Sequence, residues 1–269
     1  MSVHVKNPKA ILTDTTKCIG CRECVLACKD RYKLDQDIPR KWSLDDGLSA
    51  KNWTSIIEKP GQKYIRKQCR HCDEPACASA CPVGALHKTE TGAVVYDSDK
   101  CLGCRYCMMA CPYGIPRYDW DLAVPYVRKC VLCNDYVKKG ETPACTSACP
   151  TEATIFGDRD DLLKEAKRRI AENPDKYIDH VWGEKEVGGT SVLYISDIDM
   201  SFLSYGTKLG EKSMPARTKT AMEAVPPVFV GMAGTMTGLY WIIKRRMKNM
   251  EQQAPQVEKT EEVKGGEDE

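Results

Sequence analysis

The chain has little net charge, few aromatic residues and almost no histidine. Its 40 Lys and Arg residues nearly balance 38 Asp and Glu, and the formal net charge over 269 residues is +2. A charge so close to zero gives no support for a nucleic-acid partner. Phe, Trp and Tyr together make up only 7% of the residues, so few large aromatic side chains are present to fill an ordinary hydrophobic core.

Several chemical motifs are also missing. The sequence has no glycine-rich nucleotide fingerprint and no C-x-x-C-H haem site, and it has only four histidines. No residues are therefore predicted to be catalytic. The first residues, MSVHVKNPKAIL, contain no apolar run and no twin arginine, so no export signal is expected there.

Cysteine is abundant instead, and it is spaced for chemistry. The stretch Lys100–Pro112 has the pattern C-x2-C-x2-C-x3-C-P. In bacterial ferredoxins this spacing lets three thiolates bind one 4Fe–4S cluster while the fourth ligates a second cluster. Gly103 leaves room for close approach of the backbone to the cluster, and Pro112 turns the chain away from it.

Three further groups of cysteines complete the pattern. The first group has the same spacing but is followed by Lys29 in place of proline, and the second and fourth are extended to C-x2-C-x4-C-x3-C-P and C-x2-C-x11-C-x3-C-P. The four groups in chain order are Cys18, Cys21, Cys24, Cys28; Cys69, Cys72, Cys77, Cys81; Cys101, Cys104, Cys107, Cys111; and Cys130, Cys133, Cys145, Cys149. All 16 cysteines are used, and four 4Fe–4S clusters are predicted.

Zinc sites and disulfides are the alternatives for so many cysteines. Structural zinc sites usually show two C-x2-C pairs, and dense disulfides are typical of short secreted chains. A structural zinc protein stays the weaker alternative, which a visible absorption spectrum would separate from a cluster protein. His71 and His87 lie near the motifs, but we interpret them as polar neighbours and not as ligands.

The motifs repeat in the order compact, extended, compact, extended. KCIGCREC at Lys17 recurs as KCLGCRYC at Lys100, and PACASACP at Pro75 recurs as PACTSACP at Pro143. This indicates a tandem duplication. We therefore expect an α+β fold of two pseudo-symmetric, bacterial-ferredoxin-like lobes with two clusters each. The expected four-cluster domain spans 1–157, with an insertion of loop and strand pieces at 30–67.

The intervening segments are expected to pack around the cluster sites. Ala10–Thr13 predicts a short strand, and a hairpin is predicted around Glu90–Gly92. The loop Asn134–Pro143 is polar and is expected to face solvent or a partner. In the packing and linker segment 158–222, Asp160–Glu172 predicts an amphipathic helix capped by Asp158 or Asp160, and Gly188–Ser196 predicts a strand.

A single membrane-spanning helix is predicted over 223–244. Ala224–Ile243 is uncharged and long enough to cross about 30 Å of hydrocarbon. Pro226 and Pro227 are expected in its first turn, and three glycines are predicted to lie on one face for close helix packing: Gly231, Gly234 and Gly238. The basic segment and acidic tail of 245–269 are expected to follow. A helix buried in a soluble core is the alternative.

These stretches together resemble a known family. The four cysteine groups, YIRKQCRHC, CRYCMMACPYGIPRYD, GEKEVGGTSVLYIS and the terminal helix resemble the membrane-anchored, four-cluster iron–sulfur subunits of bacterial respiratory complexes. The nearest kinds are the iron–sulfur subunits of uptake hydrogenases and of formate dehydrogenase-N. The cysteine pattern alone is shared with partners of molybdopterin reductases.

The resemblance implies which motifs share clusters. It pairs the first motif with the fourth and the second with the third, so that each cluster takes three cysteines from one motif and one from its partner. The implied ligand sets are Cys18, Cys21, Cys24, Cys149; Cys28, Cys130, Cys133, Cys145; Cys69, Cys72, Cys77, Cys111; and Cys81, Cys101, Cys104, Cys107.

The resemblance also implies a function and partners. The chain is expected to carry electrons between a catalytic large subunit, of molybdopterin or nickel–iron type, and a quinone-reactive or cytochrome subunit in the inner membrane that contacts 225–243. Lys244, Arg245, Arg246 and Lys248 crowd behind the helix, which favours a cytoplasmic C-terminus and a periplasmic body. Export as a passenger on a signal-bearing partner is then expected. The alternative is an iron–sulfur subunit of a cytoplasm-facing molybdopterin reductase.

Overall fold

The computed structural model describes residues 5–35, 46–120, 126–204 and 209–253. It has two compact units, 1–217 and 218–269. The cysteines all lie in the first unit. Pro39 and Trp42 of the expected insertion and the acidic tail lie outside the described residues.

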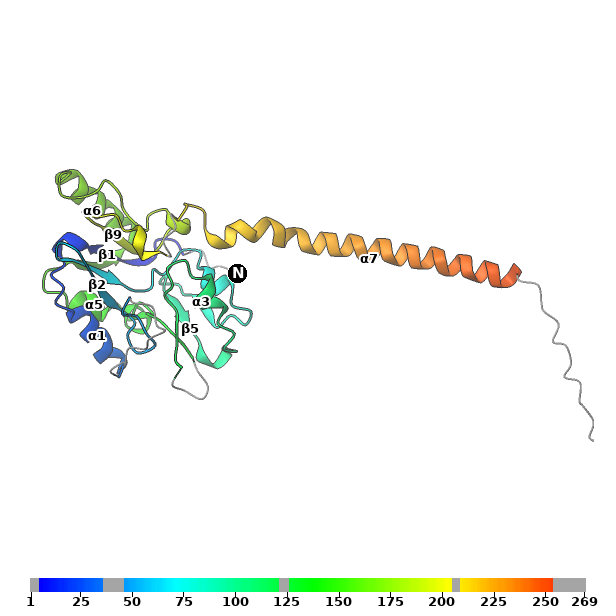
Figure 1. Ribbon diagram of the computed structural model, residues 1–269, viewed down its shortest axis with the longest axis horizontal. Coiled ribbons are helices and arrows are strands. Elements are labelled where there is room, and N and C mark those ends of the chain that lie inside the picture. Colours follow the sequence, from blue (N-terminus) through cyan, green and yellow to red (C-terminus); the bar gives the residue numbers. More distant parts are fainter. Residues whose placement is uncertain (1–4, 36–45, 121–125, 205–208, 254–269) are drawn as a thin grey trace, which may run out of the picture. The chain divides into compact units, whose positions relative to one another are not determined.

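The first unit is a mixture of short strands and helices (Figure 1). Its strands are β1 (Lys9–Asp14), β2 (Ser55–Lys59), β3 (Lys63–Lys67), β4 (Leu86–Lys88), β5 (Val94–Tyr96), β6 (Arg117–Tyr118), β7 (Val127–Arg128), β8 (Thr154–Asp158) and β9 (Val192–Ile195). Its helices are α1 (Glu23–Tyr32), α2 (Ala76–Ser79), α3 (Tyr106–Ala110), α4 (Asn134–Val137), α5 (Ala144–Ser147) and α6 (Arg159–Glu172), and its 3-10 turns are η1 (Thr15–Lys17), η2 (Ser98–Lys100), η3 (Glu186–Gly188) and η4 (Ser201–Leu203).

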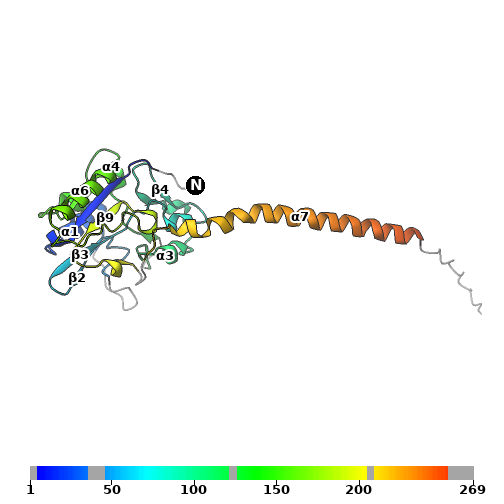
Figure 2. The same ribbon diagram turned by 90° about the horizontal axis from the view of Figure 1, so that it is seen from above.

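A three-stranded sheet of order β8–β1–β9 joins the two ends of this unit. β1 pairs antiparallel with β8 and parallel with β9. Side chains along β1 alternate between the two faces, as a strand requires. Ile11 packs with Cys24 and Leu132, whereas Ala10 and Leu12 pack with the buried face of α6. The sheet therefore separates the cysteine-bearing loops from α6, which runs beside it (Figures 1 and 2).

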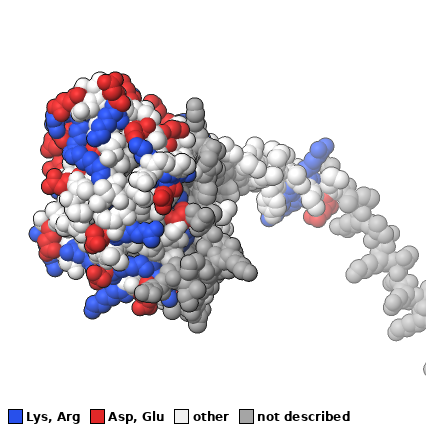
Figure 3. Space-filling model, turned by 60° about the vertical axis from the view of Figure 1, so that its left-hand side comes forward, with Lys and Arg blue, Asp and Glu red and all other residues white. Residues whose placement is uncertain are grey.

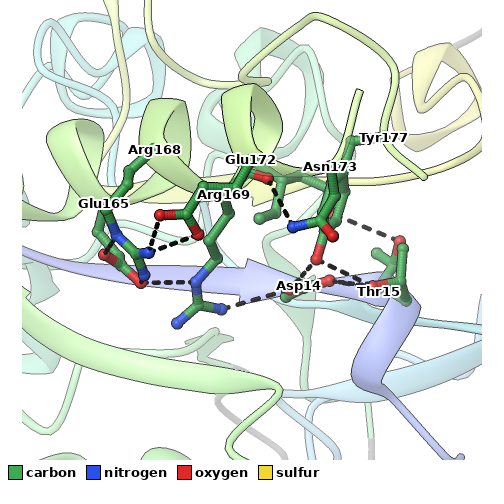
Figure 4. A network of polar contacts seen from close by, with 10 residues as sticks. Asp14, Thr15, Glu165, Arg168, Arg169, Glu172, Asn173 and Tyr177 are labelled. Carbon is green, nitrogen blue, oxygen red and sulfur yellow. Dashed lines mark hydrogen bonds and ion pairs between the residues drawn. The ribbon is translucent and has the colours of Figure 1, made fainter. Parts of the chain in front are cut away.

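A polar network at the end of β1 fixes α6 on the sheet (Figure 4). The Asp14 carboxylate is completely buried and accepts hydrogen bonds from the Tyr177 hydroxyl at 2.9 Å and from the Arg169 guanidinium at 3.3 Å. It also accepts bonds from the backbone N–H and the hydroxyl of Thr16. One carboxylate thus ties β1, η1, α6 and the segment after α6 together.

Most of the predicted elements are present. β1, α6 and the hairpin of β4 and β5 lie where the sequence predicts them, and β9 is the central part of the predicted strand Gly188–Ser196. α6 buries Leu162, Ala166 and Ile170, as its periodicity indicates. Asp158 occupies the cap position of α6 but makes no capping hydrogen bond, because its carboxylate pairs with Lys9 at 2.9 Å.

The expectation for Asn134–Pro143 was only partly right. Lys138, Lys139 and Gly140 are exposed as expected, but the segment starts with α4 and buries Asn134 and Val137. The Asn134 side-chain oxygen accepts hydrogen bonds from the hydroxyls of Thr89 and Thr91, at 3.1 and 2.8 Å. A polar residue is buried here because its hydrogen bonds are satisfied.

The long helix α7 (Met214–Gln253) starts earlier than the sequence predicts. Pro226 and Pro227 lie inside it, so their placement in the first turn was wrong. The helix begins instead at Ser213, whose hydroxyl accepts a hydrogen bond from the Ala216 N–H at 3.3 Å and caps the first turn. Among the described residues, α7 is the one helix long and apolar enough to cross a membrane.

Candidate iron–sulfur cluster sites

The two compact cysteine motifs have the same local backbone. Each is preceded by an aspartate, Asp14 or Asp97, whose carboxylate caps a 3-10 turn by accepting a hydrogen bond from the backbone two residues on. Each then places an arginine in the left-handed region before a helix, with φ of 66° at Arg22 and 64° at Arg105. Repeated sequence therefore gives repeated loop geometry, although the symmetry of whole lobes stays a prediction.

A glycine in each compact loop is required by its surroundings. Gly20 has φ of +72° and Gly103 has φ of +71°, values that side-chain-bearing residues rarely adopt. A Cβ would lie 2.6 Å from the ring of Tyr64 at Gly20 and 2.8 Å from the hydroxyl of Tyr118 at Gly103. These loops are thus pressed against an aromatic side chain, a constraint that the sequence did not reveal.

The two extended motifs also share a structure. Pro75 and Pro143 each precede a one-turn helix, α2 or α5, whose third and fourth residues donate their N–H groups to the proline carbonyl. Cys77 and Cys145 lie in these helices and are buried. The last cysteine of each motif follows the helix, so it leaves the loop in a different direction from the preceding three.

The first two groups of thiols surround cavities. Cys18, Cys21, Cys24 and Cys149 line one small cavity. Cys28, Cys130, Cys133 and Cys145 line another. Each cavity therefore draws three cysteines from one motif and one from another.

In the third and fourth groups, neighbouring thiols change one another's pKa. Burial, followed by the thiolates of Cys111, Cys69 and Cys77, holds the pKa of Cys72 well above its ordinary value. Burial and the neighbouring Cys101, Cys81 and Cys104 raise the pKa of Cys107 to about 11. The thiols of each of these two groups thus lie near one another, and the division of the sixteen cysteines into four ligand sets stays a prediction.

The four groups follow one another in space. Cys24 of the first group has Cys145 of the second as a neighbour, Cys130 of the second has Cys69 of the third, and Cys77 of the third has Cys107 of the fourth. In each of these pairs, one thiol is close enough to raise the pKa of the other. The order along the body is therefore first, second, third, fourth.

Burial raises the pKa of eight of the sixteen thiols in the cluster-free chain. Burial raises the pKa of Cys24 to about 11 and that of Cys28 to about 12, with nearby thiolates adding to the effect. Cys149 differs: burial acts to raise its pKa, but hydrogen bonds from Thr154 and Thr151 outweigh burial and lower it. On binding, iron must displace the protons of the thiols whose pKa is raised.

Backbone N–H groups also point at the sulfurs. Gly103 donates to Cys101 at 3.4 Å, Leu132 to Cys130 at 3.4 Å, and Ile115 to Cys111 at 3.5 Å. Such N–H···S contacts stabilise thiolate charge and raise the potential of a bound cluster. Together with the backbone hydrogen bonds from Thr151 and Thr154 to Cys149, loop backbone therefore contributes to the electrostatics of all four groups.

The residues present fit a 4Fe–4S cluster. The donor set is wholly thiol, and the thiols of the first two groups surround a cavity. Within the described ranges, no three His, Cys, Asp or Glu side chains converge closely enough to hold a single metal ion. The fully buried Arg66 guanidinium has no nitrogen or oxygen acceptor among the described residues, and its hydrogen-bonding neighbour is the Cys145 sulfur, so the sulfur atoms of a cluster would supply further acceptors.

The two histidines near the motifs differ in burial. His71 is fully buried, and its Nδ1 accepts the Val94 N–H at 2.9 Å, so its proton lies on Nε2. Burial, with Lys129 and Lys88 nearby, holds its pKa well below the ordinary value, and the ring is neutral. His87 is exposed.

Comparison with known proteins decides the family. Residues 61–159 match the 4Fe-4S dicluster domain, and residues 15–32 match a 4Fe-4S binding domain. The Hydrogenase-2 operon protein HybA of Escherichia coli O157:H7 is 37% identical over 280 residues, covering 89% of this chain and 85% of HybA. The chain belongs to the 4Fe-4S iron–sulfur subunits of bacterial respiratory complexes.

Two other relatives of this iron–sulfur subunit come from Escherichia coli K12. The iron–sulfur subunit of nitrate-inducible formate dehydrogenase is 38% identical, with 69% of this chain and 67% of the relative covered. The B subunit of anaerobic dimethyl sulfoxide reductase is 40% identical over 56% of this chain and 74% of its own length. The chain is thus an electron-transfer subunit of an oxidoreductase, without a catalytic site of its own, and the zinc alternative is removed.

Sequence reasoning missed the buried polar residues around the cysteines. Arg66, Gln68 and Arg70 are nearly inaccessible to solvent, yet they stand in a stretch of alternating basic residues that suggests a solvated strand. The signal that could have found them is their position: they lie immediately before and within the second cysteine motif.

Proposed function

We propose that this iron–sulfur subunit binds four 4Fe–4S clusters and passes electrons between a catalytic subunit, of formate dehydrogenase or hydrogenase type, and a quinone-reactive membrane subunit. The observation that carries the proposal is the spatial order of the four cysteine groups, each next to the following one. When bound, each cluster takes up and releases one electron with little change in its ligands.

The chain's own residues would hold the clusters and exclude water from them. The proposed ligand sets are Cys18, Cys21, Cys24, Cys149; Cys28, Cys130, Cys133, Cys145; Cys69, Cys72, Cys77, Cys111; and Cys81, Cys101, Cys104, Cys107. Cys21 and Cys104 are exposed and belong to the first and fourth groups, whereas no cysteine of the two middle groups is exposed. Exposure at the two ends suits exchange of electrons with other subunits.

The apolar helix supports a membrane partner. α7 has an uncharged stretch, Ala224–Ile243, followed by Lys244, Arg245, Arg246 and Lys248. The membrane subunit would contact the 225–243 part of this helix. The positive-inside rule favours a cytoplasmic C-terminus in the inner membrane, a single pass and a periplasmic cluster body. Export would then depend on a signal-bearing catalytic partner.

The surface of the cluster body favours protein partners of mixed charge. Figure 3 shows Lys and Arg side chains interspersed with Asp and Glu over one face, without a large region of one sign. Such a face has no basic track that a nucleic acid would follow.

Cluster content tests the function. The full-length subunit, purified anaerobically with the subunits that accompany it, is expected to be brown and to hold about sixteen iron atoms, since each cluster contains four. Four one-electron signals are expected in paramagnetic resonance during reductive titration. Stable protein with two or fewer signals would contradict the proposal, and the catalytic type of the co-purifying large subunit identifies the donor.

Topology separates the proposed arrangement from a cytoplasm-facing reductase. The similarity to the B subunit of dimethyl sulfoxide reductase favours this second candidate, although that match covers only 56% of the chain. Alkaline phosphatase fused after Glu269 should be inactive if the C-terminus is cytoplasmic. Activity of that fusion, which requires export, would place the C-terminus outside and overturn the periplasmic assignment of the body.

A further inference from the structure

Three side chains around the cysteines carry N–H groups that meet no nitrogen or oxygen acceptor in the described part of the chain, although the Cys145 sulfur is a hydrogen-bonding neighbour of Arg66. Arg66, Gln68 and Arg70 occupy every second position along β3 and the chain that follows it, and they are 1%, 1% and 6% exposed. The unpartnered atoms are Nε, Nη1 and Nη2 of Arg66, Nε2 of Gln68 and Nη1 of Arg70. These three residues are called the donor row below.

Burial of unpartnered donors is costly, and for a charged group the cost is greater still. Within the described part of the chain, neither Arg66 nor Arg70 has a carboxylate within ion-pair distance. The remaining structure fixes the row in place nonetheless. The Tyr194 hydroxyl donates to the Arg66 carbonyl at 2.7 Å, and the backbone of β9 donates to the Arg70 carbonyl at 3.1 Å.

The donor row follows the order of the cysteine groups. Arg66 lines the cavity of the first group, and the thiolate of Cys145 in the second group is also beside it. Gln68 lines the cavity of the second group. Arg70 acts electrostatically on Cys72 of the third group, and its guanidinium stacks 4.0 Å from the ring centre of Tyr194.

We propose that the donor row supplies N–H hydrogen bonds to sulfur atoms of the first three clusters and thereby raises their reduction potentials. The inference rests on the proposed function, because it requires the clusters to be present. A reduced cluster carries one more negative charge, so N–H donors and a fixed positive charge stabilise the reduced form more than the oxidised form. The two arginines supply charge and donors, whereas Gln68 supplies a donor alone.

The fourth group provides a comparison inside the same molecule. None of the largest influences on Cys107 is a basic side chain; they are burial, the thiols of Cys101, Cys81 and Cys104, and backbone. The donor row ends at Arg70, beside the third group. Substitutions in the donor row should therefore leave the reduction potential of the fourth cluster unchanged.

Redox titration of the complex monitored by paramagnetic resonance tests the proposal. Arg66→Gln should move one or two of the four signals to more negative potential, and Arg70→Gln should move a different one. Gln68→Leu, which removes a donor without changing charge, should move the second cluster alone and by less. Low-temperature resonance Raman spectra should show altered iron–sulfur stretching in the same variants.

A matched control is available one residue away. Lys67 lies in the same strand, has the same charge, and pairs with Asp46 at 2.9 Å. Lys67→Gln should leave all four potentials unchanged. If the Arg66→Gln variant does not assemble, the Arg66→Lys variant is titrated instead, since it keeps the charge but loses the forked donors. Its reduction potential should shift to a more negative value, by less than the loss of the whole charge would cause.

The outcomes separate this inference from the proposed function. Wild-type protein that lacks four clusters would overturn the proposed function. Wild-type protein with four clusters, together with potentials in the Arg66, Gln68 and Arg70 variants equal to those of the wild type, would overturn the role of the donor row alone. Equal shifts in Lys67→Gln and Arg66→Gln would do the same, because the effect would then be one of general charge.

Discussion

The Tyr177 hydroxyl donates a hydrogen bond to the completely buried Asp14 carboxylate at 2.9 Å, across 163 residues of chain. The Arg169 guanidinium approaches the same carboxylate from α6 (Figure 4). This group of contacts therefore holds the cysteine-free part of the body against the strand that leads into the first cysteine motif.

Removal of the Asp14 carboxylate should weaken the whole first unit. Asp14→Ala leaves the buried Tyr177 hydroxyl without its acceptor and removes one of the two carboxylates that pair with Arg169, the other being Glu165, which should cost roughly 3 kcal/mol. For a body of this size, the temperature at which cluster absorbance bleaches should fall by roughly 6–12 °C. Asp161→Ala, which removes a solvent-exposed pair with Lys164, is the control and should change it little. Equal effects of the two changes would contradict the assigned role of Asp14.

Crossed ligation predicts which cysteine substitutions act alike. Cys18→Ala and Cys149→Ala, far apart in sequence, should remove the same paramagnetic signal because both thiols line the first cavity. Cys145→Ala should remove a different one, although Cys145 and Cys149 belong to one motif. Each variant is titrated in the intact complex, with protein level checked by immunoblot. Loss of one shared signal in the Cys145 and Cys149 variants would show that the motif closes on its own cluster.

Asp46 predicts a dependence of stability on pH. Burial acts to raise its pKa, but the hydrogen bond from Lys67 and the charge of Arg117 outweigh burial and lower the pKa below the ordinary 3.8. A lowered pKa means that the charged contact stabilises the fold above pH 3.8 and that this contribution is lost as pH falls through the lower folded value. Asp46→Asn should unfold roughly tenfold faster at pH 7, which corresponds to about 1.4 kcal/mol.

Rapid mixing into urea measures this difference before acid releases sulfide from the clusters. The ratio of the two unfolding rates should stay constant between pH 7 and about pH 4.5, where Asp46 is fully charged, and should approach one only below the ordinary pKa. A ratio that already declines between pH 7 and pH 5 would assign the effect to another group.

The glycines of α7 predict a helix–helix contact. Gly231, Gly234 and Gly238 have no atom within 4 Å of the place that a Cβ would occupy, so no contact among the described residues requires them. Glycine weakens a helix, and close packing against a membrane partner would give the three a use. Gly234→Leu should release the membrane subunit during detergent purification, whereas Met236→Leu, at an exposed position on the opposite face of the same helix, should not. Retention of the partner in both variants would argue against this contact.

The sequence predicted the cofactor better than it predicted the protein around it. Cysteine spacing is set by the chemistry of the cluster, so the grouping of Cys101, Cys104 and Cys107 follows from local sequence. The start of α7 could not be predicted in the same way. A hydropathy argument finds the apolar stretch but overlooks the polar residues before it, which also form helix and are capped by Ser213. The burial of Arg66 depends on β9 and on the cavity beside it, and neither is encoded near Arg66.

The strand order β8–β1–β9 also has a consequence for biosynthesis. β1 is made first, but both of its neighbours come from residues beyond Thr154, after the last cysteine motif has been translated. The central strand of the sheet therefore stays unpaired, and the cysteine loops beside it stay open, until almost the entire body has left the ribosome. Translation itself thus leaves the nascent chain an open interval in which an iron–sulfur assembly system can reach thiols that the finished fold encloses.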